Sequence, residues 1–194
     1  PVLRRTVEAL ASAPEITELI VVTRADRLEA VQALCEGLSK PVSVVPGGKT
    51  RAESVLCGLS AAAMPYAAIH DGARPLVTVE LIDEVLDAAR VYLAAAPAVP
   101  VRDTIKVAHD GIVERTPDRS ALFAVQTPQV FAADLLKAAL QSAIADGATI
   151  TDDCSAVERM GKEVHLTEGS EENIKITTPV DLAIAEAILQ RRGE

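Results

Sequence analysis

Aromatic residues are nearly absent from this chain. Its 194 residues include no tryptophan, two tyrosines and two phenylalanines, although 49% of them are hydrophobic. The core must therefore be built from Ala, Val, Leu and Ile, which is typical of parallel sheets that helices cover on both faces. The length fits one domain with a core of its own.

Cysteine, histidine and positive charge are also scarce. Cys35, Cys57 and Cys154 lie far apart, which argues against a disulfide framework or a zinc cluster and fits a reducing cytoplasm. The three histidines are scattered and form no metal motif. The formal net charge of −9 argues against a nucleic-acid partner. We find no signal peptide and no membrane-spanning apolar run, so we expect a cytoplasmic protein.

Apolar residues alternate along the chain between helical spacing and short buried runs. The expected helices are 2–11, 27–38, 53–63, 78–92, 132–145, 152–160 and 179–191. The expected strands are 19–22, 42–45, 66–70, 96–100, 123–126, 164–167 and 173–176. This alternation implies right-handed crossovers. The sequence therefore predicts an α/β fold with a Rossmann-like, doubly wound, mostly parallel sheet in a single domain over residues 1–194.

Residues 101–125 interrupt this rhythm with the pattern of a β-hairpin. Residues 104–108 and 112–116 flank Asp110-Gly111, a pair that tolerates the positive φ angles of a tight turn. An isolated hairpin is marginally stable in water, so it should pack against another surface. A partner subunit is the natural candidate for that surface.

Two polar loops follow expected strands, at the positions where open α/β sheets bind ligands. The first, Gly47-Gly48-Lys49-Thr50-Arg51, looks like the end of a Walker loop, but Ser43 stands where that motif requires glycine. It is either an ordinary strand-to-helix turn or a nucleotide contact to which Arg51 and Ser54 add their side chains.

The second loop is His70-Asp71-Gly72-Ala73-Arg74. Asp71 and Arg74 either form a helix cap and a weak surface ion pair, or the floor of a site with a metal and phosphates beside Asp71. Further on, Lys175 points away from the isoleucines on each side of it, and an inward lysine would need an anion such as phosphate. Thr151-Asp152-Asp153 by itself indicates an N-cap followed by acidic first-turn residues.

Together, six segments in one order resemble the 2-C-methyl-D-erythritol 4-phosphate cytidylyltransferase family over essentially the whole chain. They are GGKTRAESV at 47–55, HDGARP at 70–75, PVRDTIK at 100–106, QTPQVF at 126–131, TDD at 151–153 and NIKIT at 173–177. The resemblance implies a fold of the nucleotide-diphospho-sugar transferase type and a homodimer interlocked through a β-arm at 101–125. It also implies chemistry that depends on Mg²⁺ or another divalent cation. CTP and methylerythritol phosphate would give CDP-methylerythritol and pyrophosphate, a step of the non-mevalonate isoprenoid pathway.

The resemblance also implies roles, position by position. The nucleotide-binding residues are Gly47, Gly48, Lys49, Arg51, Ser54, Asp71, Gly72 and Arg74, with Asp71 also at the metal. The substrate-binding residues are Thr104, Arg119, Thr127, Thr151 and Lys175. Arg119 and Lys175 are the catalytic candidates, and Arg119 would reach the substrate phosphate of the other subunit. Lys49 departs from the family, in which an acidic residue can stand there.

A larger departure concerns the beginning of the chain. The family starts with a strand and a loop of pattern G-x-G-x-R, followed by Pro-Lys, which wraps the triphosphate. No segment here matches it, and Pro1 aligns just after it, so we expect the native protein to be longer. Two alternatives stay open: a ribitol-5-phosphate cytidylyltransferase, and a truncated, non-catalytic nucleotide-binding domain. A dinucleotide-dependent oxidoreductase ranks last, because no G-x-G-x-x-G follows a predicted strand.

Overall fold

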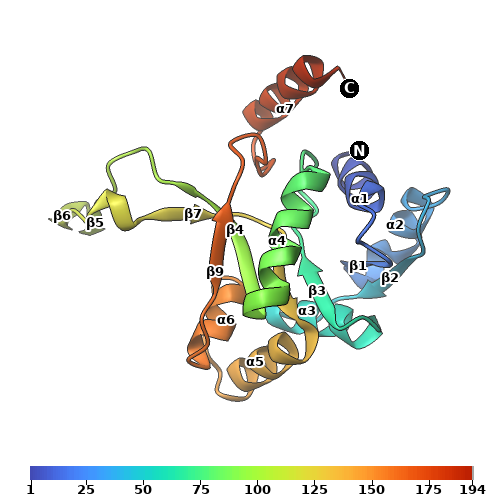
Figure 1. Ribbon diagram of the computed structural model, residues 1–194, viewed down its shortest axis with the longest axis horizontal. Coiled ribbons are helices and arrows are strands. Elements are labelled where there is room, and N and C mark those ends of the chain that lie inside the picture. Colours follow the sequence, from blue (N-terminus) through green and yellow to red (C-terminus); the bar gives the residue numbers. More distant parts are fainter. Residues whose placement is uncertain (194) are drawn as a thin grey trace.

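The computed structural model describes residues 1–193, in which helices cover the strands on both sides (Figure 1). The helices are α1 (Val2–Ser12), α2 (Leu28–Leu34), α3 (Arg51–Ala61), α4 (Val79–Tyr92), α5 (Ala133–Ala145), α6 (Asp153–Arg159) and α7 (Pro179–Arg192), with short 3₁₀ turns η1 (Ala25–Arg27) and η2 (Arg119–Ala121). The strands are β1 (Leu19–Thr23), β2 (Val42–Pro46), β3 (Tyr66–Ile69), β4 (Ala94–Pro100), β5 (Val107–His109), β6 (Ile112–Arg115), β7 (Phe123–Val125), β8 (Gln129–Ala132) and β9 (His165–Glu168).

The strands form a parallel pair, a five-stranded sheet and a hairpin. β1 pairs in parallel with β2. In the five-stranded sheet, β4 pairs in parallel with β9 on one edge, and antiparallel with β8 and then β7 on the other. β3 pairs antiparallel with β8. β3, β4 and β9 therefore share one direction, and β7 and β8 are the antiparallel members. The predicted α/β, doubly wound class is confirmed.

Two apolar layers cover the two faces of the five-stranded sheet. On one face, Phe131 of β8 packs with Leu136 and Leu140 of α5, beside α3 and α6. On the other face, the adjacent Val130 packs with Ile82 of α4. The pleat thus sends neighbouring β8 side chains into opposite layers. Full burial of one such large apolar side chain stabilises the fold by about 1.5–3 kcal/mol.

The predicted strand at 173–176 is wrong. This segment is a loop that docks on the loop after β3, where the Ile176 N–H donates to the Ala73 carbonyl at 2.8 Å. The alternation of isoleucine and lysine reflects extended backbone, but the segment joins no strand ladder. β8, in contrast, was not predicted, because four residues leave little room for a detectable pattern before α5 begins. The predicted helix 27–38 is also too long, since α2 ends at Leu34.

Gly169 allows the chain to leave β9 towards the docked loop. A Cβ atom at this position would lie 2.8–3.0 Å from backbone atoms of Ala98, which is too close for any side chain. The Gly169 N–H donates to the Ala98 carbonyl at 2.9 Å. The glycine therefore fixes where residues 170–176 begin, and so where Lys175 lies.

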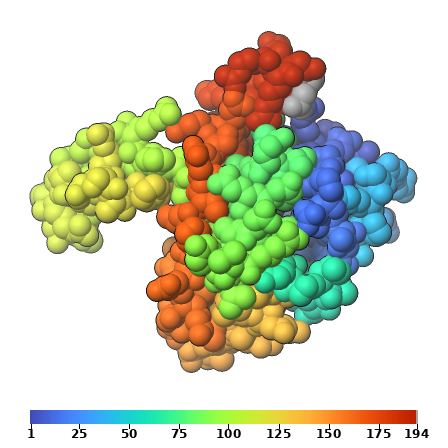
Figure 2. Space-filling view, viewed as in Figure 1, coloured from blue at the N-terminus to red at the C-terminus, as the bar shows by residue number. Residues whose placement is uncertain are grey.

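The hairpin β5–β6 stands clear of the rest of the molecule (Figures 1 and 2). Its turn has φ angles of 50° at Asp110 and 79° at Gly111, as the Asp-Gly pair predicted. Large apolar side chains are exposed along this arm, namely Ile105, Ile112, Val113, Phe123 and Val125. The arm thus presents several large apolar side chains that are 40–75% exposed.

Cys35, Cys57 and Cys154 are free thiols, and Cys35 and Cys154 are buried. Between residues 1 and 193, no helix is both long enough and apolar enough to cross a membrane.

Candidate active site

The loop between β2 and α3 folds back on the start of its own helix. The Thr50 side chain accepts from the Glu53 N–H at 3.1 Å, and the Glu53 carboxylate accepts from the N–H groups of Lys49 at 2.6 Å and Thr50 at 3.0 Å. The Ser54 hydroxyl accepts from the Gly48 N–H at 3.2 Å. A Cβ at Gly48 would lie 2.3 Å from the Glu53 side chain, so only glycine fits there. Most amides of this loop are thus bonded internally.

Arg51 connects this loop to the start of α6. One of its Nη atoms lies 2.5 Å from an oxygen of Asp153, whose side chain is fully buried. Burial raises the pKa of the Asp153 carboxyl, and the hydrogen bond from Arg51 opposes that rise. Gln129 of β8 accepts from the Asp153 N–H at 3.2 Å and donates to Asp152 at 2.8 Å. Arg51 therefore holds two loops together, a contact that the sequence did not predict.

The N-cap of α6 is Asp152, whose carboxylate accepts from the Ser155 N–H at 2.9 Å, one residue later than the N-cap at Thr151 that the predicted helix 152–160 implied. Thr151, immediately before it, is exposed and donates its N–H to the Ser155 hydroxyl at 3.2 Å. The side chain of Thr151 therefore lies at the surface, two residues before Asp153.

Asp71 is the centre of a compact charge cluster. Its Oδ2 lies 3.2 Å from Nε of Arg74 and 3.1 Å from Nζ of Lys175. Burial alone would raise the pKa of the Asp71 carboxyl, but Lys175 and Arg74 together hold that pKa below its usual value. Arg74 is itself fixed, because its Nη1 donates to the Asn173 carbonyl at 2.6 Å. The structure therefore brings Lys175 of the segment 173–177 to Asp71 and Arg74 of the segment 70–75, which are about 100 residues away in the sequence.

His70 and Thr127 lie directly behind Asp71. The Thr127 hydroxyl accepts from the Asp71 N–H at 3.1 Å, and lies 3.0 Å from Nδ1 of His70. Nε2 of the same ring lies 3.1 Å from the Arg74 carbonyl. Burial lowers the pKa of His70 to about 4, although the hydrogen bond to the Arg74 carbonyl acts in the opposite direction. His70 is therefore a neutral part of the site near pH 7.

The buried His70 predicts a loss of stability in acid. Unfolded histidine binds a proton near pH 6.5 but His70 does so only near pH 4, so the unfolded state gains protons first and stability falls as the pH drops between these values. Urea unfolding at pH 7 and pH 5 should show a drop about 2 kcal/mol larger in the wild type than in His70→Gln. His109 and His165 are present in both proteins. Equal drops would contradict the assignment.

The two arm residues lie apart from this cluster. Thr104 is exposed, and Arg119 Nη1 donates to the Arg102 carbonyl of the same arm at 2.5 Å. Over residues 1–193, no hydrogen bond or ion pair joins Arg119 to Asp71 or Lys175. One chain by itself therefore assembles the Asp71 cluster with Thr127 beside it, but not Thr104 or Arg119.

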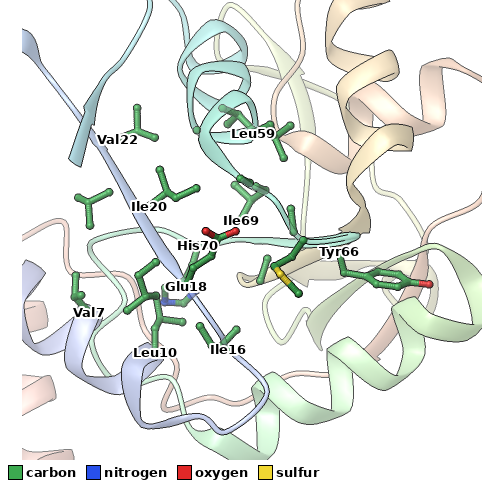
Figure 3. A pocket seen from close by; sticks show the side chains of 18 of the residues that line it. Val7, Leu10, Ile16, Glu18, Ile20, Val22, Leu59, Tyr66, Ile69 and His70 are labelled. Carbon is green, nitrogen blue, oxygen red and sulfur yellow. The ribbon is translucent and has the colours of Figure 1, made fainter. Parts of the chain in front are cut away.

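A cavity of about 480 Å³ lies between β1 and β3 and borders this cluster. Its walls are mainly apolar, and Figure 3 shows Val7 and Leu10 from α1, Ile20 and Val22 from β1, and Ile69 and His70 from the β3 segment around it. Within residues 1–193, neither β1 nor β3 has a strand partner other than β2 and β8, respectively. Arg51 and Asp71 also line the cavity, so Asp71 faces open space rather than packed core.

The model of the 2-C-methyl-D-erythritol 4-phosphate cytidylyltransferase family matches residues 1–191. The chain belongs to this family. A cytidylyltransferase of this name from Symbiobacterium thermophilum is 47% identical over 196 residues, covering 100% of this chain and 82% of the relative. One from Caldanaerobacter subterraneus is also 47% identical, covering 98% of this chain and 87% of the relative.

Solved structures agree with this membership. The crystal structure of 4-diphosphocytidyl-2C-methyl-D-erythritol synthase from Anaerococcus prevotii superimposes with a TM-score of 0.90 at 32% identity, covering 97% of this chain and 86% of that one. The 2-C-methyl-D-erythritol 4-phosphate cytidylyltransferase from Thermus thermophilus gives 0.81 at 35% identity, with coverages of 97% and 89%. The cytidylyltransferase fold thus extends over nearly the whole chain.

Proposed function

We propose that this protein transfers CMP from CTP to 2-C-methyl-D-erythritol 4-phosphate, giving CDP-methylerythritol and pyrophosphate in the non-mevalonate isoprenoid pathway. The observation that carries the proposal is the family match over residues 1–191. The cluster of Asp71, Arg74 and Lys175 supports it, because a reaction between two phosphates needs cations gathered at one place. The names of the relatives favour methylerythritol phosphate over ribitol 5-phosphate as the acceptor.

The reaction requires no protein nucleophile. An oxygen of the substrate phosphate attacks the α-phosphorus of CTP, the bond from that phosphorus to the bridging oxygen breaks, and pyrophosphate leaves with the electron pair. Catalysis then consists of positioning and of neutralising the charge on the phosphate oxygens. Lys175 suits this role because its side chain is 48% exposed while its Nζ lies 3.1 Å from Asp71, at the edge of the cluster.

The nucleotide would lie across the loops that follow β2 and β3. The amides of Gly48 and Lys49 bond to Ser54 and Glu53, so contacts to CTP from this loop would come from carbonyl groups and from the side chains of Lys49 and Arg51. Gly47 and Gly72 would let the backbone approach the ligand closely. Thr127 and Thr151 would lie on the acceptor side.

Magnesium fits Asp71. A hard cation takes one or two carboxylates together with phosphate oxygens and water, and the lowered pKa keeps the Asp71 carboxylate ionised. No group of three His, Cys, Asp or Glu side chains within residues 1–193 could hold a metal, so the remaining ligands would come from CTP and water. The bound cation would offset negative charge on the triphosphate.

The working unit would be a homodimer formed through the arm at 101–125, in which Arg119 and Thr104 reach the substrate of the partner. The exposed apolar side chains of the arm, such as Ile112 at 75% exposure, support this arrangement because a second subunit would cover them. The scattered free cysteines favour a cytoplasmic location.

The test is a ³¹P NMR assay with CTP and methylerythritol phosphate. Signals of pyrophosphate and of a diphosphate diester should grow together while both substrates decline, and EDTA should stop the reaction until Mg²⁺ is restored. Release of pyrophosphate without consumption of methylerythritol phosphate would contradict the proposed acceptor. Turnover in the presence of EDTA would contradict the metal requirement.

A further inference from the structure

Side-chain hydrogen bonds join three segments next to Asp71, at residues 70–74, Thr127 and Asn173. The Thr127 hydroxyl contacts both the Asp71 N–H and His70 Nδ1. Asn173, which is 1% exposed, donates from Nδ2 to the Thr127 carbonyl at 2.9 Å. Arg74 then donates to the Asn173 carbonyl at 2.6 Å. The hydrogen bonds of Thr127, Asn173 and Arg74 therefore fix the position of the Asp71 backbone.

The directions of these hydrogen bonds follow from the chemistry of each group. A carbonyl oxygen only accepts, so the Nε2 of His70 must carry the proton that bonds the Arg74 carbonyl at 3.1 Å. In a neutral imidazole, the other nitrogen is then an acceptor. Nδ1 must therefore accept from the Thr127 hydroxyl, and the same hydroxyl oxygen accepts from the Asp71 N–H.

The single proton of the Thr127 hydroxyl is thus already used. Thr127 is only 6% exposed, and its hydroxyl has one remaining lone pair and no proton to donate to a phosphate. In this arrangement the Thr127 hydroxyl serves the Asp71 N–H and His70, in addition to the place beside the substrate that the resemblance implied.

We propose that His70 and Thr127 are positioning residues that act through the backbone of Asp71. The Nδ1 of His70 orients the Thr127 hydroxyl, the hydroxyl oxygen holds the Asp71 N–H, and the Asp71 carboxylate is thereby kept at the point where Lys175 and Arg74 meet. This inference rests on the proposed function, since the effect on turnover requires that Asp71 act in the CMP transfer.

The first test is NMR of the intact protein with ¹⁵N-labelled histidine, which reports the tautomer of His70 independently of any activity. We expect a protonated Nε2 and an unprotonated Nδ1 near pH 7. A proton on Nδ1, alone or in an imidazolium, would overturn the hydrogen-bond directions on which the inference depends. Because this readout needs no substrate, it separates a failure of this inference from a failure of the proposed function.

The second test compares Thr127→Val with Thr127→Ser. Valine keeps the shape but leaves the Asp71 N–H without its acceptor, so we expect kcat to fall roughly 10- to 100-fold with little change in KM for methylerythritol phosphate. Serine restores the hydroxyl and should recover most of the rate. Ser60→Ala serves as the control with wild-type kinetics, because it removes an exposed hydroxyl that bonds the Leu56 carbonyl of its own helix, α3.

Two results of this comparison would overturn the proposal. If Thr127→Val mainly raised KM for methylerythritol phosphate, Thr127 would be a direct ligand of the acceptor. If Thr127→Ser were as slow as Thr127→Val, the hydroxyl would not be the group that matters. Melting temperatures of all three variants establish that the comparison is made between folded proteins.

Discussion

Replacing Lys175 with methionine should lower kcat/KM for CMP transfer about 10²- to 10³-fold. Loss of one preorganised donor to a developing negative charge typically has an effect of this size. Methionine keeps most of the length of lysine and removes only the charge. The ammonium group lies 3.1 Å from Asp71 Oδ2, and we infer that it exchanges this carboxylate for the substrate phosphate when the acceptor binds.

Steady-state kinetics of CMP transfer test this expectation against a matched control. Lys162 follows α6 and is exposed, so Lys162→Met removes an equal charge away from Asp71 and should leave kcat/KM unchanged. A loss smaller than tenfold in Lys175→Met would contradict the catalytic role of this lysine. Lys175→Arg should recover only part of the rate, because the guanidinium is a larger, planar group than the ammonium.

Arg119→Ala should have a second large effect, roughly a 10²-fold fall in kcat/KM, because a charge-assisted contact to phosphate is lost. Arg119 lies on the protruding arm, where it bonds to Arg102. The arm strands β5 and β6 stand away from β3, the strand that precedes Asp71 (Figure 1). A role for this arginine in catalysis therefore requires that it act on the substrate of a partner subunit.

Mixed dimers distinguish this arrangement from one in which each subunit acts alone. A heterodimer that carries Arg119→Ala on one chain and Lys175→Met on the other contains one site with both native residues only if Arg119 acts across the interface. Such a heterodimer should regain about half of the wild-type activity, since one of two symmetric sites is intact. No recovery above the two mutant homodimers would contradict the interlocked model.

The sequence predicted those parts of the site that depend on local patterns. The apolar run at 66–70 followed by Asp71 and Arg74 indicated a ligand loop at the end of a strand, and β3 does end at Ile69. The pattern T-x-x-E at Thr50 and Glu53 is also a capping-box signature, and it could have placed the start of α3 correctly. Local hydrogen bonds of this kind are encoded within a few residues.

The contacts between distant segments could not be predicted in the same way. Arg51 and Asp153 are 102 residues apart, and only the folded chain brings them together. Lys175 was expected on a strand, whereas it lies on a loop whose position depends on Asn173 and on the close approach of Gly169 to β4. The alternation of residues gave no indication that the Lys175 ammonium lies 3.1 Å from Asp71.

The proposal that CMP is transferred to methylerythritol phosphate is tested most directly by comparing two acceptors. The measured quantity is the ratio of kcat/KM for methylerythritol phosphate to that for ribitol 5-phosphate, with CTP and Mg²⁺ held constant. Both acceptors carry a phosphate and hydroxyl groups, but they differ in chain length, in the methyl group and in the number of hydroxyls, so contacts to these parts distinguish them. We expect a preference of roughly 10-fold or more for methylerythritol phosphate. Equal rates, or a preference for ribitol 5-phosphate, would contradict it.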